Sequence, residues 1–392
     1  MRHVVEYSWE SLNKAGEELC GDSVIIRSGP DSFVAVLSDG LGSGVKASIL
    51  STLTAEIAAH MFDSGASVEE VLQTLVETLP ECSVRKMAYA TFSVLMVRQG
   101  HEASLVEFDS PPLIVVRDGL LVDLPVEVRE VKGRSIREAR FTLKDNDCMV
   151  MISDGYEHAG LGGMYRLGWG RKNIALAVQR FLKTGVDAFK MTQALSRTCL
   201  KLYDDKPGDD STVISMRVRP AVSVSILTGP PANKELDAFA VSRLLDSEGA
   251  KIICGGSTSQ MAARILGKEL EVDWIPPWKR TGDTPSKKKG SPPTARLEGM
   301  DLVTEGILTL GQTVELMRQA RTCDDLPHDK DAATRLARYL LAADDILLLV
   351  GSAINPNQVA DIVRGESMRM VYLRELIQDL TGRNKQVKVE KI

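Results

Sequence analysis

The tripeptide Ser-Asp-Gly occurs twice in this chain, and each copy directly follows an apolar run typical of a buried strand. The run Phe33–Leu37 precedes Ser38–Gly40, and the run Cys148–Ile152 precedes Ser153–Gly155. Each pattern predicts a strand that ends in a carboxylate, followed by a glycine that leaves room beside it. Whatever fold the chain adopts must therefore place aspartates at the ends of buried strands.

Two further acidic sites have the same context. Gly21-Asp22-Ser23 leads into an apolar strand pattern, and Gly208-Asp209-Asp210-Ser211-Thr212 leads into another. If these strand ends meet, their carboxylates repel one another unless a cation or protons lie between them. Carboxylate oxygens suit magnesium or manganese, and a pair of such ions can activate water and neutralise charge on a phosphoryl group. The sequence therefore predicts a divalent-metal site.

The length of 392 residues favours two domains. In the first part, many strand patterns lie in one block with helical patterns before and after them, which predicts α+β layers. The expected strands are 4–9, 22–27, 32–37, 90–97, 103–108, 113–116, 120–122, 139–143, 148–152 and 211–219, and the expected helices are 51–61, 67–79, 172–183 and 187–203.

After Pro220 the pattern changes, and strands alternate with helices. Glycines follow the strands, so residues 220–392 are predicted to form a Rossmann-like α/β domain with a parallel sheet. The expected strands are 222–227, 251–254 and 344–350, and the expected helices are 235–248, 260–266 and 358–363. A Pro- and Lys-rich segment at about 276–296 is expected to be a mobile loop, and the tail 383–392 is expected to be frayed.

This second domain contains a candidate ligand loop, Gly255, Gly256, Ser257 and Thr258, between an expected strand and an expected helix. Its backbone N–H groups could hold an anion, although the Walker lysine is missing. Glycine loops at 228–229 and 351–352 would then line the same crevice for a small molecule. The alternative is that these glycines only turn the chain.

Composition excludes some classes of function. The net charge of -5 and the scattered basic residues disfavour a nucleic-acid-binding protein. No apolar run is long enough to span a membrane, and the first residues lack the apolar core of a signal peptide. A cytoplasmic protein is expected.

Taken in order, the acidic motifs resemble those of a known family. Gly-Asp at 21–22, Asp-Gly-x-Gly at 39–42, Ser-Asp-Gly at 153–155 and Gly-Asp-Asp-x-Thr at 208–212 resemble the metal-dependent protein phosphatases of the 2C type. The likeness is greatest to the bacterial signalling branch that includes the sporulation stage II protein E phosphatase domain. The resemblance covers about residues 1–219. It implies an αββα sandwich, two Mn²⁺ or Mg²⁺ ions between the sheets, and hydrolysis of phosphoserine or phosphothreonine.

The resemblance also assigns roles to residues at matching positions. Asp22, Asp39, Asp154 and Asp209 match the catalytic metal aspartates, and Gly40 matches the glycine whose carbonyl completes a metal shell. Asp210 stands where relatives often carry asparagine, so we expect it to support the ligands. Lys46 is a candidate phosphate partner, and its alternative role is that of a solvated helix lysine. No general acid matches.

We therefore expect a protein phosphatase with an appended domain, residues 220–392, that senses a ligand or docks a partner. The resemblance suggests a small regulatory substrate, such as an anti-sigma-factor antagonist. A non-catalytic, ligand-sensing regulator built on a degenerate phosphatase fold is the alternative. A phosphotransferase with an aspartyl-phosphate intermediate is a further one, but the Asp-x-Asp pattern usual for such enzymes is missing at both Ser-Asp-Gly sites.

Overall fold

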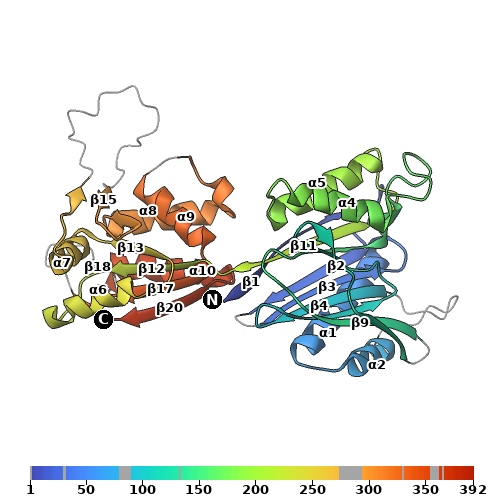
Figure 1. Cartoon of the computed structure of the whole chain (residues 1–392), viewed down its shortest axis with the longest axis horizontal. Coiled ribbons are helices and arrows are strands. Elements are labelled where there is room, and N and C mark those ends of the chain that lie inside the picture. The colour runs from blue at the N-terminus through green and yellow to red at the C-terminus, as the bar shows by residue number, and fades with distance from the viewer. Residues whose placement is uncertain are drawn as a thin grey trace. The chain divides into compact units, whose positions relative to one another are not determined.

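The structure is a computed structural model, and it describes residues 2–29, 32–78, 90–131, 134–272, 294–328, 331–353, 362–363 and 366–392. The chain divides into two compact units, Met1–Pro220 and Ala221–Ile392 (Figure 1). Each unit has its own sheets and its own core. None of the helices in the described ranges is long and apolar enough to cross a bilayer.

The first unit contains two antiparallel sheets. One has the order β1 (His3–Leu12), β11 (Ser211–Pro220), β10 (Cys148–Ile152), β6 (Ile114–Arg117) and β7 (Leu120–Leu121). The other has the order β2 (Asp22–Ser28), β3 (Ser32–Gly40), β4 (Ala90–Arg98), β5 (Glu102–Phe108), β9 (Arg134–Thr142) and β8 (Val126–Val131). The helices are α1 (Gly44–Asp63), α2 (Val68–Thr78), α3 (Asp154–His158), α4 (Gly170–Leu182) and α5 (Ala188–Leu202).

Side chains that alternate along the strands build the layers of this unit. On β3, Phe33 and Leu37 pack between the two sheets, whereas Val34 and Val36 pack against α1 and α2. On β10, Met149 and Met151 face the other sheet, while the alternate residues Cys148, Val150 and Ile152 face α3, α4 and α5. Each sheet is therefore buried on both faces, and the predicted αββα sandwich is confirmed (Figure 1).

Several elements of this unit differ from the prediction, among them α1, β8 and the short helix α3, which was not expected after β10. Helix α1 begins at Gly44, ahead of the expected start at Ser51, because Ala47 and Leu50 already belong to its buried face. Strand β8 was not predicted. It is the edge strand of its sheet, and an exposed Val128 (67% accessible) gives it no buried apolar face that a sequence pattern would reveal.

An ion pair inside the first unit gives a first prediction. The Asp147 carboxylate is fully buried and accepts hydrogen bonds from Arg117 Nε (2.8 Å), Arg117 Nη2 (2.6 Å) and the Lys144 backbone N–H (2.8 Å). Asp147→Asn should lower the free energy of unfolding by roughly 1.5–3 kcal/mol, the usual value of hydrogen bonds to charged groups. Calorimetry would measure the loss.

The control for this prediction is Glu56→Gln. Glu56 makes an exposed ion pair with Arg27 at 3.5 Å, so its loss should cost less than about 1 kcal/mol. An equal effect of the two substitutions would contradict a structural role for the buried pair.

The second unit contains a seven-stranded, mainly parallel sheet. Its order is β14 (Glu271–Val272), β15 (Thr294–Arg296), β16 (Leu302–Thr304), β13 (Ala250–Cys254), β12 (Ser223–Thr228), β17 (Asp345–Val350) and β20 (Gln386–Lys391). A short pair, β18 (Ile362–Val363) and β19 (Glu366–Ser367), lies apart from it. The helices are α6 (Asp237–Leu245), α7 (Gly256–Leu266), α8 (Ile307–Gln319), α9 (Ala332–Ala342) and α10 (Met368–Gly382), with single 3₁₀ turns at Lys234–Leu236 and Cys323–Asp325.

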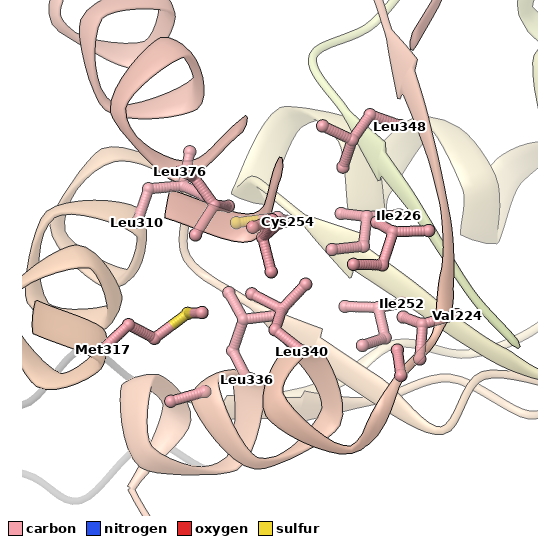
Figure 2. Packing of buried hydrophobic residues seen from close by; sticks show 14 of the residues in the cluster. Val224, Ile226, Ile252, Cys254, Leu310, Met317, Leu336, Leu340, Leu348 and Leu376 are labelled. Carbon is pink, nitrogen blue, oxygen red and sulfur yellow. The ribbon is translucent and has the colours of Figure 1, made fainter. Parts of the chain in front are cut away.

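Apolar side chains cover both faces of this sheet. Figure 2 shows the larger cluster, in which Ile226 and Ile252 of the sheet meet Leu310, Leu336 and Leu376 of α8, α9 and α10. Helices α6 and α7 pack on the opposite face. Parallel strands are stable when both faces are covered, so the fold follows from the alternation of strands and helices in the sequence.

Several expectations for the second unit were wrong. Residues 256–259 are not a loop, because α7 already begins at Gly256. The tail is not frayed, since β20 pairs in parallel with β17. Within the expected mobile loop 276–296, Thr294–Arg296 form β15, and positions 276–293 lie outside the described residues. Of the expected helix 358–363, Ile362–Val363 form a strand, and the rest also lies outside the described residues.

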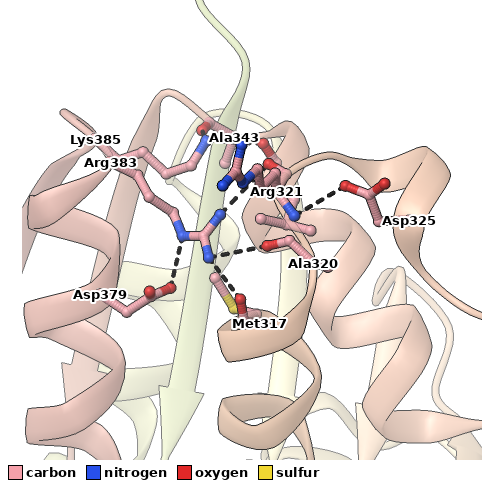
Figure 3. A network of polar contacts seen from close by, with 9 residues as sticks. Met317, Ala320, Arg321, Asp325, Ala343, Asp379, Arg383 and Lys385 are labelled. Carbon is pink, nitrogen blue, oxygen red and sulfur yellow. Dashed lines mark hydrogen bonds and ion pairs between the residues drawn. The ribbon is translucent and has the colours of Figure 1, made fainter.

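Two basic side chains complete the ends of α8 and α9 (Figure 3). Arg383 donates to the carbonyl oxygens of Met317, Ala320 and Arg321 and pairs with Asp379 at 2.8 Å. Lys385 donates to the carbonyl of Ala343, at the end of α9. The last carbonyls of a helix lack partners within the helix, so these cations both satisfy them and oppose their negative potential.

Candidate active site

The predicted aspartates lie at strand ends in both sheets of the first unit. Asp22 begins β2 and stands directly opposite Asp39 near the end of β3. In the other sheet, Asp154 follows β10, and Asp209 precedes β11. The two sheets stack face to face, and β10 and β11 are neighbours, so these ends converge. The negative charges of Asp22, Asp154 and Asp209 all contribute to raising the pKa of Asp39, so the four carboxylates lie in the same region.

The Asp22 side chain is buried, with 6% of its surface accessible. Burial raises its pKa to about 7, and the nearby hydroxyls of Ser153 and Thr212 oppose this rise. Neither hydroxyl completes a hydrogen bond to it, and both Asp22 oxygens lack a partner among the described residues. A buried carboxylate without partners is costly, so a proton or a cation is favoured at this position.

The pKa of Asp39 is raised more than that of Asp22. Burial and, after it, the charges of Asp22 and Asp154 together raise the pKa of Asp39 to about 9. Two ionised carboxylates so close together favour either protons or a cation. At neutral pH a divalent cation satisfies them better, because it keeps all of the carboxylates ionised.

Asp210 links two of the loops that carry site residues. Its Oδ1 accepts the backbone N–H of Lys14 (3.0 Å), while its Oδ2 is buried without a partner in the described part of the chain. The Lys14 ammonium also approaches Asp209 Oδ1 at 3.6 Å. Asp210 therefore anchors the loop before β2 to the loop before β11.

Glycines allow these segments to approach closely. A Cβ on Gly40 would lie 2.2 Å from the carbonyl oxygen of Ala47 and 2.9 Å from that of Gly21. A Cβ on Gly155 would lie 2.1 Å from the carbonyl oxygen of Asp210. Both Ser-Asp-Gly glycines are thus required by backbone packing, which the sequence did not reveal. Lys46 is exposed on the first turn of α1.

Sequence reasoning missed several residues around the site. Lys14 and Glu17 lie on the loop before β2, and Glu17 accepts a hydrogen bond from the Ser43 hydroxyl at 2.9 Å. Ser153 accepts the Thr212 backbone N–H at 2.8 Å and so ties the two strand ends together. Only Ser153 had a signal in the sequence, because it belongs to the repeated tripeptide.

The donor set fits divalent ions. Within the described ranges, no three acidic, histidine or cysteine side chains lie close enough together to hold an ion. The charges that act on Asp39 and the partnerless oxygens of Asp22 nevertheless mark a space that needs positive charge. Magnesium and manganese take such oxygen ligands.

In the second unit, the candidate ligand residues belong to a helix. Gly256, Ser257 and Thr258 form the first turn of α7, and Gly255 precedes it with a φ of 135°. The loops after β12 and β17 do lie side by side, since Thr228 pairs with Val350 in the parallel ladder.

Comparisons with known proteins concern mainly the first unit. Residues 29–219 match the family model described as stage II sporulation protein E, SpoIIE. A search of curated proteins finds no match. Among solved structures, the SpoIIE phosphatase domain of Bacillus subtilis is 19% identical, with 56% of this chain and 93% of that chain covered and a TM-score of 0.41.

Two more solved structures are similar. The Bacillus subtilis SpoIIE PP2C domain with a fragment of its regulatory domain is 19% identical, covering 56% of this chain and 64% of that one, with a TM-score of 0.46. The catalytic domain of the serine/threonine phosphatase PstP, in complex with two manganese ions, is 17% identical, covering 56% and 100%, with a TM-score of 0.37.

Proposed function

Because residues 29–219 belong to the SpoIIE family of PP2C-type protein serine/threonine phosphatases, we propose that this chain hydrolyses phosphoserine or phosphothreonine in a protein substrate, using two Mn²⁺ or Mg²⁺ ions. One observation supports the proposal above all. Asp22 is buried with both carboxylate oxygens unpartnered, beside the charges of Asp154 and Asp210. A cation is the simplest partner for such a group.

The proposed roles follow from position. Asp22, Asp39, Asp154 and Asp209 hold the ions, and the Gly40 carbonyl adds a further oxygen. Asp210 keeps the loops on either side in register through the Lys14 backbone. Lys46, on the first turn of α1, is a candidate contact for the phosphate of the substrate.

When bound, the ions supply an activated water and neutralise the charge that builds up on the phosphoryl group. The protein's own contribution is to fix the carboxylates on rigid strand ends before the substrate arrives. The hydrogen bond from the Thr212 N–H to Ser153 Oγ, at 2.8 Å, holds two of those ends at a constant separation.

The test is a metal-dependence assay on the full chain with p-nitrophenyl phosphate. Protein stripped with EDTA should regain activity with added Mn²⁺ or Mg²⁺, by a factor above about 100, because metal stabilisation of the transition state is worth several kcal/mol. A phosphopeptide assay should show the same dependence. Hydrolysis that is equally fast in EDTA would rule out the proposed centre.

For the second unit we propose a regulatory role, in which residues 221–392 sense a small ligand and act on the phosphatase unit. A small regulatory phosphoprotein in the cytoplasm, such as an anti-sigma-factor antagonist, is the proposed substrate. Phosphorylated antagonist proteins offered one at a time to the manganese-loaded enzyme would identify it by release of phosphate.

A further inference from the structure

The sheet of the second unit has a topological switch point. In chain order its five parallel strands are β12, β13, β16, β17 and β20, but in space they run β16-β13-β12-β17-β20. The direction of strand addition therefore reverses between β12 and β17. In open α/β sheets, ligands bind beyond the carboxyl ends of the strands at this point. Here the loops that begin at Gly229 and Gly351 meet there.

A guanidinium group occupies this switch point. Leu373, Leu376 and Leu380 of α10 pack on the sheet. Arg369 lies one turn before Leu373 on the same face, so it continues this row. Its Nη2 donates to the Gly351 carbonyl at 2.9 Å. A Cβ on Gly229 would lie 1.6 Å from Nη1, so the glycine lets the guanidinium rest against the backbone.

Arg369 is held in place without a counter-charge from the described residues. No carboxylate in those ranges pairs with it, and burial lowers its pKa. Arg383, at the end of the same helix, differs, because it has Asp379 and three carbonyl groups as partners. Burying part of an arginine without an anion is unfavourable, which suggests that the anion comes with a ligand.

The N-terminus of α7 lies close to the same edge. Its N-cap residue is Gly255, no side chain caps it, and its first turn has no acidic residue. The hydroxyl of Thr258 is buried without a partner and turned toward Gly255, where an added Cβ would lie 2.9 Å from Oγ1. Cys254, the residue before Gly255, pairs with Thr228, the residue before Gly229, and Arg369 rests against Gly229. The guanidinium and the uncapped helix therefore lie at neighbouring strand ends.

The loop after β12 differs from the phosphate-binding loop of dinucleotide-binding sheets. Dinucleotide-binding sheets use glycine N–H groups of this first loop to hold a pyrophosphate. Here Pro230 and Pro231 follow Gly229 and have no N–H to donate. The first turn of α7 and the planar fork of Arg369, which matches phosphate oxygens well, can supply donors in their place.

We propose that the carboxyl edge of this sheet binds the phosphate group of a small molecule, between Arg369 and the first turn of α7. The backbone N–H groups of Gly256, Ser257 and Thr258 contact one side of the phosphate, and Arg369 contacts the other. Free phosphate and a mononucleotide share this chemistry. The site is independent of the metal centre in the first unit.

Calorimetric titration of the full chain in EDTA tests the proposal, because removing divalent ions disables phosphate binding at the first site. Inorganic phosphate and AMP are the two probes. Binding of either is expected, and Arg369→Gln should weaken it at least tenfold. Arg318→Gln is the control: Arg318 is exposed near the end of α8, and its substitution removes the same charge but should leave phosphate binding unchanged.

Binding of inorganic phosphate alone would identify a site for the free ion, and tighter binding of AMP would identify a nucleotide site. Absence of binding by both probes, or equal binding by Arg369→Gln, would overturn the proposal. If circular dichroism shows that Arg369→Gln is unfolded, Arg369→Lys replaces it. Lysine keeps the charge but loses the fork, so binding should again fall several-fold, and unchanged affinity would count against the site.

Discussion

Asp39→Asn should abolish phosphatase activity and leave the fold intact. Asp39 lies among the charges of Asp22, Asp154 and Asp209, and asparagine cannot neutralise a divalent ion. We expect the rate with p-nitrophenyl phosphate and manganese to fall by a factor on the order of 10²–10³ or more, the usual effect of losing one electrostatic contact to a transition state. Asp154→Asn should behave in the same way.

The stability of Asp39→Asn separates this explanation from simple damage. In EDTA, the substitution removes a partly buried carboxylate from a cluster of like charges, so its melting temperature should equal or exceed that of the parent protein. Asp123→Asn, at an exposed position, is the control and should change neither activity nor stability. An active Asp39→Asn enzyme would eliminate the proposed centre.

Gly40→Ala should damage both stability and activity. The new Cβ would lie 2.2 Å from the Ala47 carbonyl oxygen on α1 and 2.9 Å from that of Gly21, and neither backbone can move without shifting its element. Overpacking of this kind costs about 1–3 kcal/mol, occasionally more. The clash also pushes the end of β3, which carries Asp39 and Gly40, away from α1 and from the Gly21–Asp22 segment. The phosphatase rate should therefore fall together with the melting temperature.

Gly382→Ala is the matched control for this effect. A Cβ there meets nothing within 4 Å, so alanine should be neutral or slightly stabilising at the end of α10. In EDTA, Gly40→Ala should melt below the parent while Asp39→Asn does not. A normal melting temperature for Gly40→Ala would contradict the close packing described here.

Local pattern explains how much of the first unit could be predicted. An apolar run that ends in Ser-Asp-Gly specifies a buried strand and a carboxylate at its end, whatever surrounds it. The order of four such motifs indicated that the strand ends converge, and the effect of Asp22, Asp154 and Asp209 on Asp39 agrees with that. Strand β8 could not be predicted, because its Val128 is exposed and the strand has no run of fully buried apolar residues among those that the structure describes.

The second unit was harder to predict because long-range contacts decide it. Gly-Gly-Ser-Thr has low helix propensity, but Thr258 and Ser259 are buried under tertiary packing and form part of α7. Strand β20 alternates valines with charged residues and is held by long-range contacts: its pairing with β17, the packing of Val387 against the core and the ion pair between Arg243 and Glu390. No sequence pattern around Arg369 indicates a binding residue, because its position against Gly229 and Gly351 depends on how α10 packs on the sheet.

The pairing of β1 with β11 sets the order in which a nascent chain can acquire its site. Residues 3–12 must wait for residues 211–220, whereas β2, β3, β4 and β5 pair with their neighbours as they leave the ribosome. Contacts between segments so distant in sequence form slowly. The pairing of β2 with β3, which carries Asp22 and Asp39, can therefore form first. A chain that ends before residue 211 lacks β11, the strand with which both β1 and β10 pair, and so cannot fix the strand ends beside Asp154 and Asp209.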